Sequence, residues 1–220
     1  MLWIAKFPSC HDTKNVGAWE AVTAELASGC DIQVSNFRAQ KFSSKDHTFL
    51  TRRFDRSDNG RRIHFASAMT LLGHTDGADS EKEVSYLELA EWVMGHCTDT
   101  DRNLDQLWRR IVFNIAVSNC DDHLRNHGFL LTSKGWRLSP AYDINPDEQG
   151  MGLKMSISEE DNSLDYDLAL SVAGYFSLRK VQAETILNEI RASVSNWQKV
   201  AAKWGIPRSE KELVAVAFRR

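Results

Sequence analysis

The sequence predicts an α+β fold, in which a small β-rich part comes first and a mainly helical part follows it. Strand-like runs and a single helical pattern fill residues 1–55, whereas helical periodicity dominates residues 56–220. The strongest such pattern covers residues 101–118. We therefore predict a small partial lobe over 1–55 and a helical lobe over 56–220, because 220 residues can bury a core in one domain or in two small lobes.

The first 55 residues predict a small sheet that carries one helix. Residues 2–7 have strand-like composition and end at Pro8. Residues 16–28 place apolar side chains at helical spacing. Two further strands are predicted over residues 31–37 and 47–54, with a polar loop between them.

The remaining chain is predicted to be mostly helical. Residues 85–96 and 101–118 form two helices, and the second has an apolar stripe made by Leu104, Leu107, Trp108, Ile111, Val112 and Ile115. Residues 128–131 and 136–138 then read as a hairpin around a tight turn. An apolar stripe over residues 187–204 predicts a last long helix, which Gly205 and Pro207 end.

Composition excludes several classes of function. A net charge of -3 argues against a broad nucleic-acid or membrane surface, so we expect no direct nucleic-acid binding and no membrane association. The four cysteines have no metal-ligand spacing and no disulfide framework. No secretory segment opens the chain and no apolar run is long enough to span a membrane. A reduced, cytoplasmic setting is the expectation.

The most informative segment is the run from Ser118 to His127, which follows the strongest helix. It places Asp121 and Asn126 five residues apart, and the predicted hairpin then leads to Asp143. A carboxylate that acts as a base, an amide ligand and a second, metal-holding carboxylate occur in this order in the catalytic loop of protein kinases. The order favours phosphoryl transfer from ATP.

The chemistry of phosphoryl transfer gives each of these residues a candidate role. Asp121 would orient the acceptor hydroxyl and take its proton. Asn126 and Asp143 offer the oxygen ligands that Mg²⁺ prefers. Lys6 on the first strand would reach the phosphates of ATP, and Glu20 on the next helix would hold its ammonium group.

Simpler interpretations stand beside each of these assignments. Asp121 would serve equally as a helix cap, and Asn126 as an ordinary turn residue. Lys6 would suit an edge strand, where lysine prevents aggregation, and Glu20 a solvated helix face. Taken together, Asp121, Asn126 and Asp143 favour the functional interpretation, whereas Lys6 and Glu20 taken singly do not.

A third interpretation uses the two histidines of the same segment. His123 and His127 are four residues apart, so on one helix they would bind a metal together with Asp121 or Asp122. That arrangement would indicate a metal-dependent hydrolase or nuclease. Against it, no glutamate separates the histidines in the manner of zinc proteases, and a strand is predicted to begin near His127.

Four segments resemble a known family: Trp3–Pro8, Arg53–Arg56, Asn119–Asn126 and Leu138–Asp143. Together they are similar to the C-terminal region of HipA-like serine/threonine kinases. These are bacterial toxin kinases with a phosphatidylinositol-kinase-like variant of the protein-kinase fold. The resemblance covers nearly the whole chain.

The resemblance implies a role for each matching residue. It implies that Lys6 binds the phosphates of ATP, and that Arg52 and Phe54 belong to the linker between the lobes, where the backbone meets adenine. It also implies that Asp121 is the catalytic aspartate and that Asn126 and Asp143 bind magnesium. It also implies protein substrates such as aminoacyl-tRNA synthetases, and a HipB-like DNA-binding antitoxin as partner.

The sequence departs from the family pattern at its start. Family members carry about a hundred or more residues ahead of the lysine strand, a size that a fuller two-lobe kinase needs. Here Met1 lies five residues before Lys6. The expectation is therefore a truncated or split kinase, and the alternative is a catalytically inactive kinase scaffold that binds an antitoxin or regulator.

Overall fold

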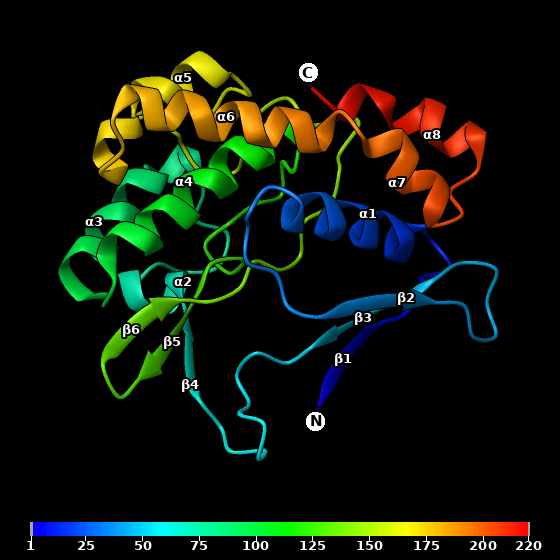
Figure 1. The fold of residues 1–220 in the computed structure, drawn as a ribbon, viewed down its shortest axis with the longest axis horizontal. Helices are drawn as coiled ribbons and strands as arrows, with labels where there is room; N and C mark the ends of the chain where they lie inside the picture. Colours follow the sequence, from blue (N-terminus) through cyan, green and yellow to red (C-terminus); the bar gives the residue numbers. More distant parts are fainter. Residues whose placement is uncertain (1, 220) are drawn as a thin grey trace.

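The computed structural model describes residues 2–219 and has an α+β architecture, as predicted (Figure 1). Six strands form two separate three-stranded antiparallel sheets. The first sheet has the order β1-β3-β2, with strands Trp3–Lys6, Phe37–Gln40 and Thr48–Arg52 for β1, β2 and β3. The second has the order β4-β5-β6, with strands His64–Ser67, Gly128–Thr132 and Gly135–Leu138 for β4, β5 and β6.

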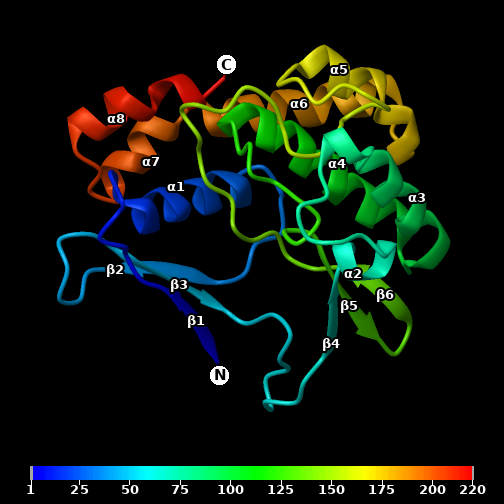
Figure 2. The same ribbon diagram turned by 180° about the vertical axis from the view of Figure 1, so that it is seen from behind.

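Helices cover the same side of both sheets, and the two sheets lie side by side beneath them (Figures 1 and 2). The α-helices are α1 Val16–Ser28, α2 Ala68–Leu72, α3 Tyr86–His96, α4 Thr100–Val117, α5 Tyr166–Ser171, α6 Lys180–Val194, α7 Trp197–Lys203 and α8 Arg208–Val214. Three short 3-10 helices are Ser80–Lys82, Ala173–Phe176 and Ala215–Ala217. No helix within residues 2–219 is both long enough and apolar enough to pass through a membrane.

Helix α1 is fixed to the first sheet at its start. The side chain of Asn15 caps the helix by accepting a hydrogen bond from the Ala18 amide, and it also accepts one from the His47 amide ahead of β3. Position 17 must be glycine, because a Cβ atom at Gly17 would lie 2.2 Å from the His47 carbonyl oxygen. These contacts determine where Glu20, one turn further, meets the sheet.

One hydrophobic core joins the two parts of the chain. Trp19 and Val22 of α1 belong to the same buried cluster as Leu107 and Ile111 of α4. Burial of this cluster stabilises the position of α1 against the helical part, at roughly 25 cal/mol per Å² of apolar surface. The predicted division at residue 55 stays a prediction.

Helix α4 buries most of its length and leads directly into the loop of interest. Its end is at Ser118, which adopts a left-handed conformation with φ of 47°. Such a residue stops a helix and redirects the chain. Residues 119–127 that follow contain turns and no helix.

Two predicted elements differ from the structure, and one strand was not predicted. The strand expected over residues 31–37 lies instead at Phe37–Gln40, and Val34 forms only an isolated bridge with Ala141. The long helix expected over residues 187–204 divides into α6 and α7, because the side chains of Ser195 and Asn196 both donate to the Ala192 carbonyl oxygen and so compete with helix bonding. Strand β4 was not predicted.

Candidate active site

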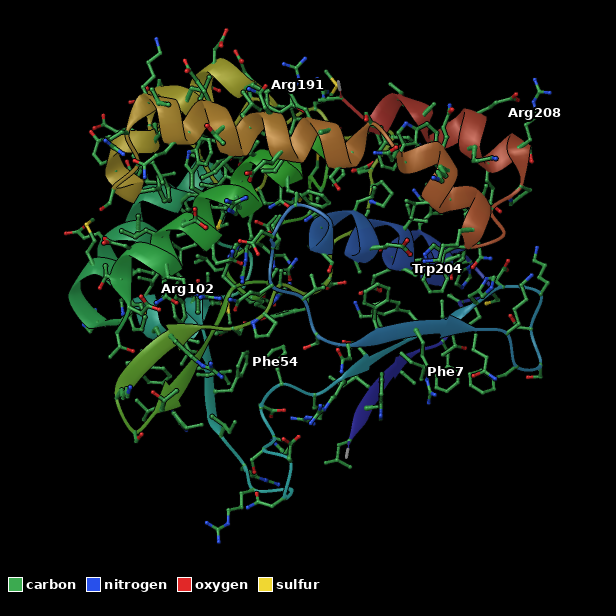
Figure 3. The ribbon with its side chains drawn as sticks, in the orientation of Figure 1. Phe7, Phe54, Arg102, Arg191, Trp204 and Arg208 are labelled. Carbon is green, nitrogen blue, oxygen red and sulfur yellow. The ribbon has the colours of Figure 1, made fainter. Side chains whose placement is uncertain are left out.

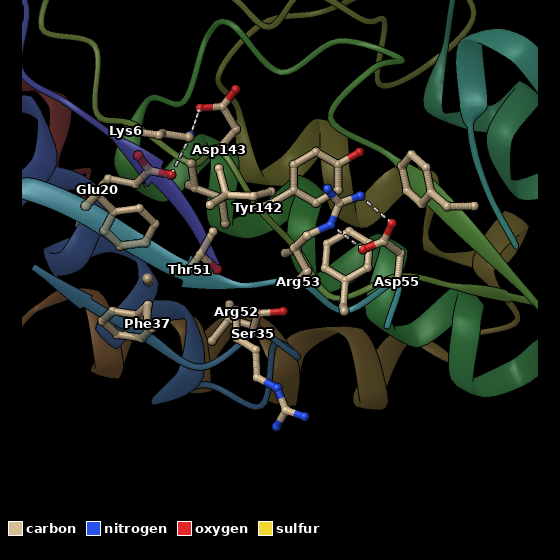
Figure 4. A pocket seen from close by; sticks show the side chains of 18 residues that line it. Lys6, Glu20, Ser35, Phe37, Thr51, Arg52, Arg53, Asp55, Tyr142 and Asp143 are labelled. Carbon is tan, nitrogen blue, oxygen red and sulfur yellow. Dashed lines mark hydrogen bonds and ion pairs between the residues drawn. The ribbon is translucent and has the colours of Figure 1, made fainter. Parts of the chain in front are cut away.

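Three distant segments meet at the ammonium group of Lys6. Its Nζ donates to Glu20 Oε1 at 2.7 Å and to Asp143 Oδ1 at 2.6 Å (Figure 4). Lys6 ends β1, Glu20 lies on α1, and Asp143 follows β6 by five residues. The fold therefore brings together the three ionic residues that the sequence placed in one candidate site.

Burial and charge shift the proton affinities of this cluster. Burial raises the pKa of Glu20 to about 7, although the neighbouring Lys6 works in the opposite direction. Burial by itself would lower the pKa of Lys6, but Glu20 and Asp143 reverse that effect and raise it. The Lys6 ammonium therefore stays charged at neutral pH and forms a fixed positive point in the site.

A cavity of about 290 Å³ opens beside these residues. Its wall is mostly apolar and includes Ile4, Ala24, Val34, Phe49 and Ile144, together with Phe54, Tyr142 and Arg52. A mostly apolar pocket with a few convergent polar groups at one end is the usual form of a small-molecule site. The five sequence-predicted residues in its wall are Lys6, Glu20, Arg52, Phe54 and Asp143.

The segment after β3 forms one end of this cavity. The ring of Phe54 packs on Tyr142 with their centroids 5.6 Å apart. The Arg53 guanidinium donates two hydrogen bonds to Asp55, which lowers the pKa of Asp55. Arg52 lines the cavity while its guanidinium pairs with Asp58.

Asp143 offers a partly exposed carboxylate at the edge of this cavity. Its backbone is left-handed, with φ of 59°, a conformation that Asp tolerates better than most residues. Its side chain is 47% exposed, and Oδ1 also accepts a bond from Asn145. Mg²⁺ takes one or two carboxylates and keeps several waters, so one accessible Asp and one amide oxygen fit it.

The two adjacent aspartates of the loop have different environments. Asp121 is exposed, whereas Asp122 is buried. The Asp122 carboxylate accepts hydrogen bonds from the Tyr86 hydroxyl at 2.6 Å and the Asn114 amide at 2.9 Å, and it pairs with His127 Nε2 at 2.7 Å. Burial opposes its ionisation, but His127 and Tyr86 outweigh burial and lower the pKa of Asp122. Asp122 therefore holds the loop, whereas the side chain of Asp121 is exposed to solvent.

Asn126 is oriented by the backbone of the same loop. Its side chain is buried, and Nδ2 donates to the Asp121 carbonyl oxygen at 3.3 Å. Because the amide nitrogen donates this bond, the amide oxygen is the atom of this side chain that can accept one. That oxygen suits the neutral ligand that the sequence assigned to Asn126.

Asp121 does not line the cavity that contains Lys6 and Asp143. It lines a second, more polar cavity of about 170 Å³, together with Asp79, Arg125 and Lys154. A hydrogen bond links the walls of the two cavities: Tyr142 lines the first, and its hydroxyl donates to the carbonyl oxygen of Arg125, which lines the second, at 2.6 Å. The seven predicted residues thus divide into five in one cavity, Asp121 in the next, and the buried Asn126.

The histidine-based metal site finds no support in this geometry. His127 is buried and pairs with Asp122, while His123 Nε2 lies 3.2 Å from the Arg125 guanidinium. The loop has no helix on which the two histidines could share a face. Within residues 2–219, no group of three His, Cys, Asp or Glu side chains is arranged to hold a metal ion.

Sequence reasoning missed the residues that hold the site together. Asn119 donates to Asn114 on α4 at 3.0 Å and accepts from the Asn145 amide at 3.0 Å, so it joins the loop to the Asp143 segment. Tyr142 connects the same two segments from the other side. The polar side chains of Asn119 and Tyr142, next to the two segments that they join, were the available signal. The neighbouring sequence does not reveal which groups these side chains bond to.

The fold and the site define a protein of the kinase-like class. A model of the HipA-like C-terminal domain matches residues 1–197, so the chain belongs to that family. It is 30% identical over 106 residues to a putative kinase of Haemophilus influenzae, a match that covers 46% of this chain and 31% of the relative.

Two solved structures share the fold. HipA of Shewanella oneidensis, determined in complex with HipB and its operator DNA, superposes with a TM-score of 0.78 at 20% identity, over 98% of this chain and 55% of that one. The Helicobacter pylori proinflammatory kinase CtkA superposes with a TM-score of 0.61 at 14% identity, over 98% of this chain and 88% of that one. The chain thus spans about half of the HipA chain and less than a third of the Haemophilus relative.

Proposed function

We propose that this chain is the catalytic part of an ATP-dependent protein serine/threonine kinase of the HipA type, acting with Mg²⁺. The observation that carries the proposal is the Lys6 ammonium, which contacts Glu20 and Asp143 at one end of a mostly apolar cavity. A lysine held by a helical glutamate beside a metal-binding aspartate is the phosphate-binding arrangement of kinases.

Each residue of the candidate site then has a chemical task. The apolar wall, with Phe54 at its end, would take the adenine ring, and the Lys6 ammonium would contact the phosphates. Asp143 and the amide oxygen of Asn126 would hold Mg²⁺, which neutralises charge on the transferred phosphoryl group. Asp121 would orient the acceptor hydroxyl and take its proton.

The partners are proposed from likeness alone. HipA of Shewanella was solved with HipB and operator DNA, and we propose a HipB-like antitoxin as the partner of this chain. An aminoacyl-tRNA synthetase is the corresponding proposal for the protein substrate. With an overall charge of -3, the chain itself is not expected to contact nucleic acid or membranes, and a cytoplasmic location is proposed.

Two substitutions separate nucleotide binding from transfer. In calorimetry with ATP and Mg²⁺, Asp143→Ala should abolish binding, whereas Asp121→Ala should keep the affinity and lose phosphate transfer to protein. Asp167→Ala, at an exposed position on α5, serves as the control and should change neither. Unchanged ATP affinity in Asp143→Ala would refute the assignment of the site.

An inactive scaffold is the second candidate, and one observation favours it. Asp121 and Asp143 line different cavities, whereas transfer requires both to act on one triphosphate. A scaffold would capture a HipB-like protein but would transfer no phosphate, even with a family N-terminal segment supplied as a separate polypeptide. Transfer that Asp121→Ala removes would exclude this candidate.

A further inference from the structure

A third cavity, of about 680 Å³, lies between α4 and the β5–β6 hairpin. It shares no lining residue with the cavities that contain Lys6 or Asp121. Arg102, Gln106 and Arg110 are four residues apart on α4, so they line it from one helix face. Figure 3 shows Arg102 above the hairpin, which supplies Lys134 and Arg137 from the opposite side.

The charge of this wall is strongly positive. Four cationic side chains line it, namely Arg102, Arg110, Lys134 and Arg137, and Asp99 is the single carboxylate among its lining residues. Within the part of the chain that the structure describes, none of the four cations forms an ion pair. Arg109, on the adjacent face of α4, instead pairs with both Asp105 and Glu189. The three exposed cations, Arg102, Lys134 and Arg137, therefore concentrate positive charge at the cavity that no ion pair within the described residues neutralises.

Arg110 is the buried part of this charge. It is only 4% exposed, and although Nη2 donates to the Ser139 carbonyl oxygen, Nε and Nη1 have no hydrogen-bond partner within residues 2–219. Burial lowers its pKa to about 10, so it remains charged at neutral pH, and nearby Asp122 is engaged with other donors. A buried cation with an incomplete set of hydrogen bonds is costly for a fold to keep. Nε and Nη1 are closed to solvent, so an anion in the cavity would act on this charge through space and not by direct contact.

The neutral polar side chains of the wall are fixed in place by the backbone. Asn103 donates to the Thr98 carbonyl oxygen and accepts from the Leu138 amide, each at 2.7 Å. Gln106 donates to the Asp31 carbonyl oxygen at 2.7 Å and accepts from the Gln33 amide at 2.9 Å. The cavity is thus preorganised, which reduces the entropy that a ligand must overcome.

We propose that this cavity binds a phosphate monoester dianion, separately from the nucleotide site. Four cations against one carboxylate favour a ligand with at least two negative charges. Guanidinium groups match phosphate oxygens two at a time, which favours phosphate where three of the four cations are arginines. The volume leaves room for the group that carries the phosphate, either a free sugar or a phosphorylated side chain of a protein.

Calorimetry without nucleotide or Mg²⁺ tests the proposal, with glucose 6-phosphate and a phosphoserine peptide as the two probes. The double variant Arg102→Gln/Arg137→Gln should weaken binding about tenfold or more, because each arginine supplies a charge-assisted hydrogen bond. Both residues are exposed, so the fold should persist. Arg208→Gln, at an exposed arginine on α8, and Lys6→Ala are controls that should leave the affinity unchanged.

The outcomes are distinct from those for the nucleotide site. Binding of either probe that the double variant weakens supports the proposal, and the tighter probe identifies whether the source is a metabolite or a protein. No binding of either probe below about 1 mM would overturn it, as would binding that Lys6→Ala removes and the double variant leaves intact. Loss of ATP binding in Asp143→Ala has no bearing on these results.

Discussion

The ammonium nitrogen of Lys6 lies 2.6 Å from Oδ1 of Asp143, although the two residues are 137 positions apart in the chain. Glu20 completes the cluster from α1. Only the folded chain brings these charges together. Changes in their protonation, or substitutions that remove them, should therefore alter the free energy of unfolding as well as the binding of nucleotide.

The stability of the protein should depend on pH through Glu20. Its pKa is raised from 4.5 to about 7, so the folded state binds more protons than the unfolded state between these values. The stabilising contribution is complete below pH 4.5 and is lost as pH rises through 7, because stability falls with pH wherever the folded state binds more protons. Urea unfolding at several pH values should therefore show a steeper decline for the wild type than for Glu20→Gln. Parallel profiles would contradict the shifted pKa.

Replacing Tyr142 should disturb the loop without removing the nucleotide cavity. Tyr142→Phe keeps the ring beside Phe54 but deletes the hydrogen bond to the Arg125 carbonyl oxygen. We expect a loss of about 1 kcal/mol in the free energy of unfolding, an unchanged Kd for ATP and a lower kcat for transfer. Tyr175→Phe, at a position 56% exposed, is the matched control. A weaker ATP affinity with unchanged kcat would argue against a link between cavity and loop.

Asp122 should be essential for folding of the loop. Asp122→Asn removes the charge that His127 and the Tyr86 hydroxyl stabilise, and we expect a loss of about 3–5 kcal/mol at neutral pH. Because its pKa is lowered in the folded state, the carboxylate stabilises the protein above the ordinary value of 3.8, and this contribution is lost as pH falls through the folded pKa. The free energies of unfolding of the wild type and the variant should thus become equal at acidic pH. A constant difference down to pH 2 would contradict this.

Glycine at position 128 lies directly against the ring of Phe65. A Cβ atom there would lie 2.1 Å from Phe65 Cε2, so the ring must shift in Gly128→Ala, and we expect a cost of about 1 kcal/mol through overpacking between β4 and β5. Gly95→Ala is the matched control, since nothing lies within 4 Å of its added Cβ in α3, and it should stabilise the protein by up to about 1 kcal/mol. Thermal unfolding of both variants measures the contrast. Equal shifts of Tm would contradict the packing argument.

Much of the fold was predictable, because strong local patterns determined it. The periodicity of α4 and the composition of β1 were sufficient to place Asp121 in the loop after its helix and Lys6 at the end of its strand. Strand β4 was not predictable: it has four half-exposed or exposed residues and pairs with β5, more than 60 positions later. The break at Ser195 depends on side-chain hydrogen bonds that apolar spacing does not reveal.

The sequence predicted which residues belong to the candidate site, but it did not predict how they are arranged in space. The order of residue types along the chain suggested Lys6, Glu20 and Asp143 together, and the structure brings them into contact. That Asp121 would line a neighbouring cavity depends on how Tyr142 meets the Arg125 carbonyl oxygen, a contact between segments 17 residues apart. No pattern along the chain determines such a contact, because it arises from the packing of the hairpin on the loop.

The proposed kinase function requires Asp121 and Asp143 to act on one nucleotide bound beside Lys6. A crystal structure with a non-hydrolysable ATP analogue and Mg²⁺ would show whether they do. We expect the adenine in the cavity beside Phe54, the phosphates at Lys6, the metal on Asp143 and Asn126, and the Asp121 carboxylate facing the terminal phosphate. A nucleotide bound elsewhere, or one whose terminal phosphate Asp121 cannot approach, would contradict it.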